Sequence, residues 1–549
     1  MGVALKASGY DAPMGMERVL RWWRSPIFLL AVVAGLLALV VQSGELGSAD
    51  TQHRMQTSHS LWTAEPQVFP NEYPEFGLRG RHGELESWYG IGQSLIALPA
   101  DGVGTFLERL SVFTEYDGTD PSVRNIVISV SMNVLLEVLT ALVCFAFLRQ
   151  LEFSLGEAVA GVLALLLATT HLHYTQNMME NNYIFLLTLA GFRYQFEWAR
   201  TGNWKAMLVG SGAFGLNLLT RLTTGLDLMA GALFLLLLLQ FDGTSGTELW
   251  RRARTYFATA LPVYGLFGLV DRIYQYRRFG SVFNTYVTIF GEQARQRNPA
   301  LPAKYPFETP FHVGFFGALF QPEKSIFLFD PLVVLMGIMT IVCWRRFSPA
   351  VKAYVIATML LVVGYISFYA RYTVWSGDFA WGDRYVETAA QFAALLAVPL
   401  LARYGQVMGV MARTIGWALV AVSLIVQVAS VAFWCPLEIY QMQTLGHPTF
   451  VIALRIENIV TFALGRPGAW GLTHAVMAAD PWDYAHITTW NFLPCLLHRV
   501  GVAPGWVVRL FQGIWAVALV GLVGTMWRLR QVVRKTDAPR SLRRDLGRL

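Results

Sequence analysis

Charged residues are scarce in this chain. Of its 549 residues only 14% are Asp, Glu, Lys or Arg, whereas 54% are hydrophobic; soluble domains carry roughly 25% charged residues. The chain therefore has too little charged surface for a water-soluble protein of this size. Cysteine is also scarce. There are four cysteines and no C-x-x-C pair, so neither a zinc ribbon nor a thioredoxin-like redox site is supported.

Two of these cysteines, Cys435 and Cys495, bracket one long polar loop. If that loop lies in an oxidising compartment, a disulfide between them is one interpretation. The other is that both are small buried apolar side chains.

Long apolar segments are abundant. A helix needs about 20 apolar residues to cross the hydrocarbon of a bilayer. We therefore predict an all-α polytopic membrane protein of about 12 transmembrane helices, with short interfacial helices near 92–99 and 282–295. The predicted spans are residues 25–42, 124–148, 156–174, 181–199, 205–220, 224–241, 256–276, 325–344, 352–370, 385–403, 412–434 and 507–527.

Basic residues cluster in every second loop and in the tail from residue 528 to 549. The positive-inside rule places these loops and both termini in the cytoplasm, with the first apolar run kept as a span rather than removed as a signal peptide. The net charge of +7 is then an orientation signal and not a nucleic-acid footprint. Three long loops fall on the other face, at about 43–123, 277–324 and 435–506.

Asp50 lies a few residues beyond the first predicted span. A carboxylate there can accept a proton from an acceptor hydroxyl while a lipid-borne donor lies in the adjacent bilayer. The alternative is an ordinary solvated acid, and Glu45 is the nearest rival for the catalytic role.

The segment 371–385 is the densest polar and aromatic stretch. Arg371 and Arg384 lie on the face where the positive-inside rule disfavours arginine. A phosphate would hold them, because guanidinium groups offer planar, bidentate donors; pairing with Asp378 or Asp383 is the alternative. Lys324, before the eighth predicted span, is a further candidate phosphate contact.

His171 and His173 lie where the third predicted span leaves the membrane. With Asp50 they could hold a divalent metal ion, although their spacing is not diagnostic. Ordinary interfacial histidines are the alternative interpretation.

Three stretches resemble polytopic glycosyltransferases of the GT-C superfamily, the group that includes dolichyl-phosphate-mannose-dependent mannosyltransferases and the lipid A aminoarabinose transferase. Residues 88–99 are similar to the "Y-G-x-G-Q-S-L…L-P" of a bacterial branch, residues 317–331 to its "G-L-L-F-S-P-x-K-G-L-F…P", and residues 375–385 to its "W-x-G-G…W-G-x-R-Y". Gln321 and Ser325 depart from the second pattern, and the adjacent Asp-Glu pair of the O-mannosyltransferases is missing. The resemblance covers roughly residues 40–405. We therefore divide the chain into a GT-C-like catalytic module, 1–405, and additional C-terminal helices with an outer loop and a basic tail, 406–549.

The resemblance implies an inverting enzyme of the bacterial inner membrane that transfers a sugar from a polyprenyl-phosphate donor to a glycan, lipid or protein acceptor on the extracytoplasmic face. By this resemblance Asp50 becomes the catalytic carboxylate, and Arg384, Arg371 and Lys324 become donor-phosphate contacts. The expected substrate-binding residues are Glu45, Arg54, Trp375, Trp381, Tyr385 and Gln93.

Two other functions stay open. A transporter or flippase of lipid-linked sugars would need polar residues along a path through the bilayer. Such residues are few within the predicted spans, and no inverted repeat is visible. A non-catalytic scaffold of envelope glycan assembly would instead use the long acidic and aromatic loops as partner surface.

Overall fold

The computed structural model describes residues 25–69, 76–113, 121–378, 380–434, 437–470, 489–500 and 503–546. These residues form a helical bundle with one small sheet, in which β1 (Leu78–Arg79) pairs antiparallel with β2 (Leu85–Glu86). The helices are α2 (Pro26–Val41), α3 (Ala49–Ser60), α4 (Gly92–Glu108), α5 (Val123–Gln150), α6 (Leu155–Ala168), α7 (His171–Gln176), α8 (Asn181–Thr201), α9 (Trp204–Thr220), α10 (Gly225–Phe241), α11 (Gly246–Phe279), α12 (Tyr286–Arg297), α13 (Phe311–Phe320), α14 (Ile326–Phe329), α15 (Pro331–Cys343), α16 (Pro349–Tyr369), α17 (Glu387–Ala394), α18 (Ala397–Tyr404), α19 (Val410–Ser430), α20 (Leu437–Leu445), α21 (Val451–Ala463), α23 (Leu493–Val500) and α24 (Gly505–Leu546). Short 3₁₀ turns occupy η1 (Ser111–Phe113), η2 (Leu222–Thr224), η3 (Trp344–Arg346) and η4 (Pro467–Trp470).

The all-α class and the membrane character are confirmed, but the count of about 12 spans is not. Within the described residues five helical segments are long and apolar enough to cross a bilayer: 123–150, 222–241, 349–369, 410–430 and 505–536. Three shorter apolar helices, α2, α6 and α13, have 16, 14 and 10 residues.

Several predicted spans are divided in the structure. The predicted span 156–174 becomes α6 and α7, and 325–344 becomes α14 and α15. In the second case Pro331 starts α15 directly after Asp330, because proline has no N–H to continue the preceding helix. Hydropathy sums over such breaks, so it counts two short helices as one span.

Helix starts follow sequence signals. Ser25, Ser48, Ser122 and Ser154 each cap a helix by accepting a hydrogen bond from a backbone N–H of the first turn. Ser154 and Glu157 form a complete capping box. Local sequence therefore fixes where α2, α3, α5 and α6 begin.

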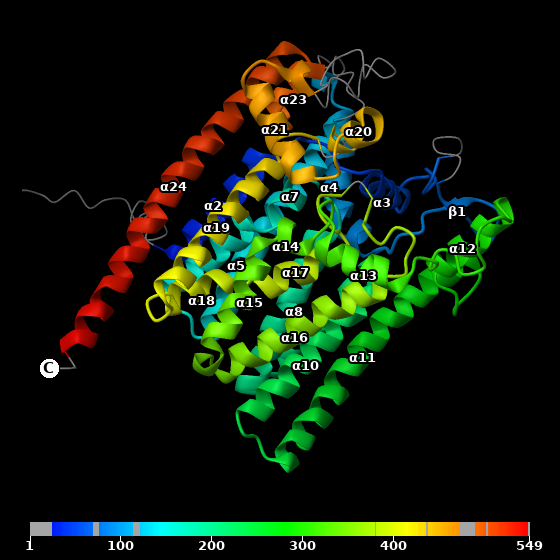
Figure 1. Cartoon of the computed structure of the whole chain (residues 1–549). Coiled ribbons are helices and arrows are strands. Elements are labelled where there is room, and N and C mark those ends of the chain that lie inside the picture. The colour runs from blue at the N-terminus through cyan, green and yellow to red at the C-terminus, as the bar shows by residue number, and fades with distance from the viewer. Residues whose placement is uncertain are drawn as a thin grey trace, which may run out of the picture.

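Figure 1 shows α24 along one flank of the bundle and α11 along the other. The α10–α11 turn lies at the bottom and the end of α24 at the lower left, whereas α23 lies at the top and α3 and α12 lie on the right. Loops predicted to share the basic side do meet: Arg403 pairs with Glu157 at 2.6 Å, and Arg200 pairs with Asp242 at 2.7 Å. The loops of the other side gather at the opposite end, which we call the site end.

The two segments expected to be interfacial helices are helical, as α4 and α12. Helix α4 is longer than predicted and packs on α3 and α5. Asp101 within it is fully buried, so α4 is part of the folded body.

The C-terminal helices pack on the rest of the chain. Helix α24 lies against α2, where the Trp515 indole donates to the Val40 carbonyl at 2.8 Å, and α19 lies against α6 and α15. The division at residue 405 stays a prediction. So does the disulfide considered for Cys435 and Cys495, since Cys435 lies outside the described residues.

Gly90 marks a close approach between the loop before α4 and the end of α9. A Cβ at this position would overlap the carbonyl oxygens of Leu219 and Thr220. Glycine is therefore required at this packing contact.

We expect Gly90→Ala to lower the free energy of unfolding by about 1–3 kcal/mol, because the added methyl group must push two backbone segments apart. Gly102→Ala is the matched control. Its Cβ would meet nothing within 4 Å, and alanine in a helix is favoured by about 0.5–1 kcal/mol over glycine. Thermal unfolding in detergent micelles measures both; equal melting temperatures for the two variants would contradict the close approach.

Candidate functional site

A cavity of about 550 Å³ opens at the site end. We call it the main cavity. Its walls come from α3, the loop before α4, the α7–α8 and α9–α10 junctions, α12, the end of α16 and the loop before α17. The charged residues of its lining are Asp50, Arg54, Glu180, Arg221, Arg295, Asp378 and Arg384, accompanied by Tyr89, Tyr286, Tyr305, Tyr369, Tyr372 and Tyr385.

Asp50 and Arg384 meet in this cavity. An Arg384 Nη1–H donates to Asp50 Oδ2 at 2.6 Å, and the Tyr89 hydroxyl donates to Asp50 Oδ1 at 2.5 Å. Both carboxylate oxygens of Asp50 are therefore engaged. Of the two interpretations of Arg384, the structure shows a carboxylate partner, but that partner is Asp50 and neither Asp378 nor Asp383.

A second cluster of charges lies beside the first. Arg54 Nη1 contacts Glu180 Oε2 at 2.6 Å, and Arg221 pairs with the other oxygen of Glu180. The three side chains are 4%, 3% and 9% exposed. Buried charges of this kind persist only when they are paired and hydrogen-bonded.

Two tyrosines join the clusters into a closed ring. The Arg54 guanidinium lies 4.1 Å from the centre of the Tyr89 ring, and those of Arg221 and Arg384 lie 5.4 and 5.2 Å from the centre of the Tyr385 ring. Following the contacts, the ring runs Arg384, Asp50, Tyr89, Arg54, Glu180, Arg221, Tyr385 and back to Arg384. We call these seven residues the charged ring.

The charged ring carries one excess positive charge, since it contains three guanidinium groups and two carboxylates. Arg295 and Asp378 elsewhere in the lining leave that excess unchanged. The buried Nε donors of Arg54 and Arg384 have no hydrogen-bond partner among the described residues. Buried donors without partners are unusual in proteins, so the main cavity suits an anion.

The charged ring sets the protonation of its members. Burial by itself would raise the pKa of Asp50, but the positive charges of Arg384 and Arg54 and the hydrogen bond from Tyr89 lower that pKa to about 2. Burial and the Asp50 carboxylate raise the pKa of Tyr89 well above its usual value. At neutral pH Asp50 is therefore ionised and Tyr89 is a neutral donor.

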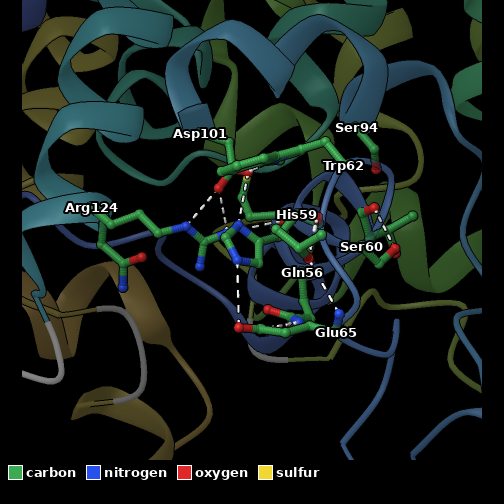
Figure 2. Close-up of polar contacts among 12 residues, drawn as sticks. Gln56, His59, Ser60, Trp62, Glu65, Ser94, Asp101 and Arg124 are labelled. Atoms are coloured by element: carbon green, nitrogen blue, oxygen red, sulfur yellow. Dashed lines mark hydrogen bonds and ion pairs between the residues drawn. The ribbon is translucent and has the colours of Figure 1, made fainter. Parts of the chain in front are cut away.

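Helix α3, which carries Asp50 and Arg54, is fixed at its far end by Asp101. Figure 2 shows the fully buried Asp101 carboxylate facing His59, Trp62 and Arg124. Asp101 Oδ2 lies 3.0 Å from His59 Nδ1 and accepts from Trp62 Nε1 at 2.7 Å, while Oδ1 accepts from Arg124 Nε at 2.6 Å. One carboxylate thus ties α3 and the turn after it to α4 and α5.

Lys324 is not a cavity residue. Its ammonium group is buried and donates to the carbonyl oxygens of Asp378, Ala380 and Gly382 at 2.6, 2.8 and 3.1 Å. These contacts hold the loop that carries Arg384, and the phosphate contact expected of Lys324 stays a prediction. Arg371 also lies outside the main cavity and lines a second, smaller one.

Of the six expected substrate-binding residues, only Arg54 and Tyr385 line the main cavity. The other four are Glu45, Gln93, Trp375 and Trp381. Glu45 and Gln93 are buried, and the Trp375 ring packs over Gly317, where a Cβ would overlap it. Trp381 is buried between Phe329, His173 and the guanidinium of Arg455.

The two candidate metal ligands diverge. His171 Nε2 lies 2.8 Å from Glu137 Oε1, whereas His173 lies against Trp381 and its Nε2 is 3.1 Å from Asn177 Nδ2. Within the described ranges no group of three His, Cys, Asp or Glu side chains is placed to hold a metal ion.

Neither Arg221 nor Glu180 was among the expected site residues. One signal was available: Arg221 follows α9 on the face where the positive-inside rule disfavours arginine. Its carboxylate partner lies 41 residues away, and sequence spacing gives no means of pairing them.

The chain was also compared with known families and proteins. No family model matches it, and no curated protein matches it.

Glu180→Gln tests the charged ring. The change leaves two buried guanidinium groups facing each other without the charge between them, so we expect the protein to lose about 3–5 kcal/mol of stability. Glu248→Gln is the matched control, because Glu248 also lies between two arginines, Arg251 and Arg252, but on the surface, where ion pairs contribute little. Chemical unfolding in micelles should separate the two variants; a Glu180 variant as stable as the control would show that the ring is not held by charge.

Proposed function

We propose that this protein is an inverting membrane glycosyltransferase that moves a sugar from a polyprenyl-phosphate donor to an acceptor hydroxyl at the extracytoplasmic face. The observation that carries the proposal is the pairing of Asp50 with Arg384 in a membrane-end cavity whose lining has one excess positive charge. A phosphodiester donor carries one negative charge, so it would balance that excess. The resemblance of residues 40–405 to GT-C enzymes is the second support.

In the proposed reaction, a bond forms between the acceptor oxygen and the anomeric carbon while the bond from that carbon to the phosphate oxygen breaks. The electron pair of the broken bond goes to the lipid phosphate, where Arg384 and Arg221 stabilise the new charge. The acceptor proton goes to Asp50. The tyrosines of the lining offer apolar faces and hydroxyl groups for the sugar.

The contacts of Asp50 limit its strength as a base until a donor binds. With one oxygen bound to Tyr89 and the other to Arg384, Asp50 is a weak base in the unliganded protein. A donor phosphate would compete for the Arg384 guanidinium. As that guanidinium turns toward the phosphate, the pKa of Asp50 rises from about 2 and the carboxylate becomes a better proton acceptor.

Buried polar groups within the helices give no support to the transporter alternative. The Tyr365 hydroxyl donates to Asp227, Asn217 donates to Thr188, and His171 contacts Glu137, at 2.9, 2.8 and 2.8 Å. Each of these groups has a partner on a neighbouring helix, an arrangement typical of helix–helix hydrogen bonds in membranes.

Asp50→Asn should lower kcat by about 10²–10⁴-fold, since the amide cannot accept the acceptor proton. Arg384→Gln should be at least as damaging, because it removes charge stabilisation at the leaving phosphate. Glu157→Gln is the matched control, because the Arg403–Glu157 pair has the same 2.6 Å separation at the opposite end of the bundle. The measurement is transfer of radiolabelled sugar from a polyprenyl-phosphate donor to an acceptor in membranes containing the protein.

Full activity of Asp50→Asn would remove the enzymatic proposal. Counterflow of lipid-linked sugar in proteoliposomes, without transfer, would favour the flippase. Unchanged glycan products in both variants would favour the scaffold.

The pH dependence provides a further prediction. The pH dependence of kcat/KM reports the pKa values of the free enzyme, and the pH dependence of kcat reports the pKa values of the enzyme–substrate complex. Since donor binding raises the pKa of Asp50 and only the carboxylate accepts a proton, kcat should decline on acidification at a higher pH than kcat/KM. Coincident acid limbs would show that the donor leaves the Asp50–Arg384 pair intact.

A further inference from the structure

A second cavity, of about 490 Å³, lies beside the main cavity. It is lined by Lys304, Phe307, Ser367, Phe368 and Arg371, and we call it the rim cavity. Phe307 and Phe368 line both cavities, so the two cavities are neighbours.

Backbone hydrogen bonds bring the two cations of the rim cavity together. The Thr309 amide donates to the Arg371 carbonyl at 3.1 Å, and the Thr373 amide donates to the Pro306 carbonyl at 2.8 Å. The segment 304–309 therefore runs along 371–373. This places Lys304 and Arg371, 67 positions apart in the sequence, in one cavity.

Neither cation is neutralised within the described residues. Lys304 and Arg371 make no ion pair and no side-chain hydrogen bond there. Glu308, in the same segment as Lys304, does not line the rim cavity; its carboxylate accepts from the Thr373 hydroxyl at 2.7 Å. Two positive charges in one small cavity create a potential that attracts an anion, and most strongly a dianion.

The rim cavity lies at the end of a candidate membrane span. Ser367 and Phe368 belong to the last turn of α16. Helix α13 packs on this end of α16, since a Cβ at Gly314 would overlap the Ala370 carbonyl. Its exposed side chains include Phe311 and Phe316, so a wide apolar surface adjoins the two cations. An anionic head group with a hydrocarbon chain fits this combination.

Sugar transfer changes the charge of the donor lipid. The diester donor has one negative charge, whereas the released phosphomonoester has a second ionisation with a pKa of about 6 and approaches two negative charges at pH 7. The main cavity has an excess of one positive charge and the rim cavity has two cations. Directly after transfer Asp50 holds the acceptor proton, so the main cavity then has two excess positive charges. Once Asp50 releases that proton the excess returns to one, and the product lipid is then matched by the two cations of the rim cavity and not by the main cavity.

We propose that the rim cavity binds the phosphomonoester head group of a lipid phosphate, with the hydrocarbon chain along α13 and the end of α16. That this lipid is the one released by sugar transfer rests on the proposed function. Lys304 and Arg371 would then draw the product away from the charged ring and clear the main cavity for the next donor.

The test is direct binding of farnesyl phosphate and of its methyl diester to the full-length protein in zwitterionic nanodiscs, by titration calorimetry between pH 5 and 8. For the native protein we expect the affinity for the monoester to rise through pH 6 while that for the diester stays flat. Lys304→Gln with Arg371→Gln should weaken monoester binding at pH 8 by about tenfold or more, since two charge-assisted contacts are lost. Arg345→Gln with Arg346→Gln, two exposed arginines of η3, is the matched control and should bind as the native protein does.

Unchanged monoester affinity in the Lys304 and Arg371 double variant would overturn the proposal. Competition by millimolar inorganic phosphate would also overturn it, by showing a site for free phosphate. Equal competition by phosphatidic acid would show a general phospholipid site and would overturn the assignment to the product.

The binding experiment contains no sugar, so it does not depend on the transfer reaction. If the expected binding pattern appears but no sugar transfer is found, the lipid-phosphate site stands and the proposed function fails. If transfer is found, product inhibition by farnesyl phosphate should weaken by about tenfold in the double variant. Transfer with unchanged product inhibition would leave the proposed function standing and remove this inference.

Discussion

The contact between Asp50 and Arg384 is the constraint on which the site end depends. It joins residues 334 positions apart, and each charge is tolerable in a partly buried cavity only because the other is present. Tyr89 and Tyr385 connect this pair to Arg54, Glu180 and Arg221, whose buried charges also depend on one another. Four separate segments of the chain must therefore arrive in register, because an error in any one would leave an unpaired charge away from water.

The surrounding packing supplies this register. Asp101 fixes α3 to α4 and α5. Lys324 holds the loop before α17 by three of its carbonyl oxygens. Arg455, buried beside Glu438 at 2.5 Å, places its guanidinium against Trp381 in the same loop. Three buried charged groups that line neither the main cavity nor the rim cavity thus hold the segments that carry the main cavity's charges. The region after residue 405 contributes one of them, which gives it a structural connection to the site.

The two cavities differ in how their positive charge is balanced. In the main cavity carboxylates compensate most of the positive charge. An anionic ligand that binds Arg384 there would have to compete with Asp50 for the guanidinium. Among the described residues no carboxylate lines the rim cavity, and its two cations are exposed, so water screens them. The two neighbouring cavities therefore differ in the charge of the anion that each would balance. This difference suits a ligand whose negative charge increases during the proposed reaction.

Composition and periodicity determined the class of the protein: apolar segments and alternating basic loops are sufficient to predict a helical membrane protein, because the bilayer imposes both. Position after a predicted span made Asp50 a candidate beside Glu45, and the positive-inside rule made Arg384 a candidate beside Arg371; the resemblance to GT-C enzymes, and not composition, favoured Asp50 and Arg384. Only the tertiary structure decided which charges pair. Lys324, Arg371 and Arg384 were all expected to contact phosphate. In the structure Lys324 donates to carbonyl oxygens and Arg371 lines the rim cavity, whereas Arg221, which was not expected, belongs to the charged ring. Pairing depends on distances between segments far apart in the chain. Helix packing and helix breaks such as Asp330–Pro331 set those distances, and neither hydropathy nor residue spacing predicts them.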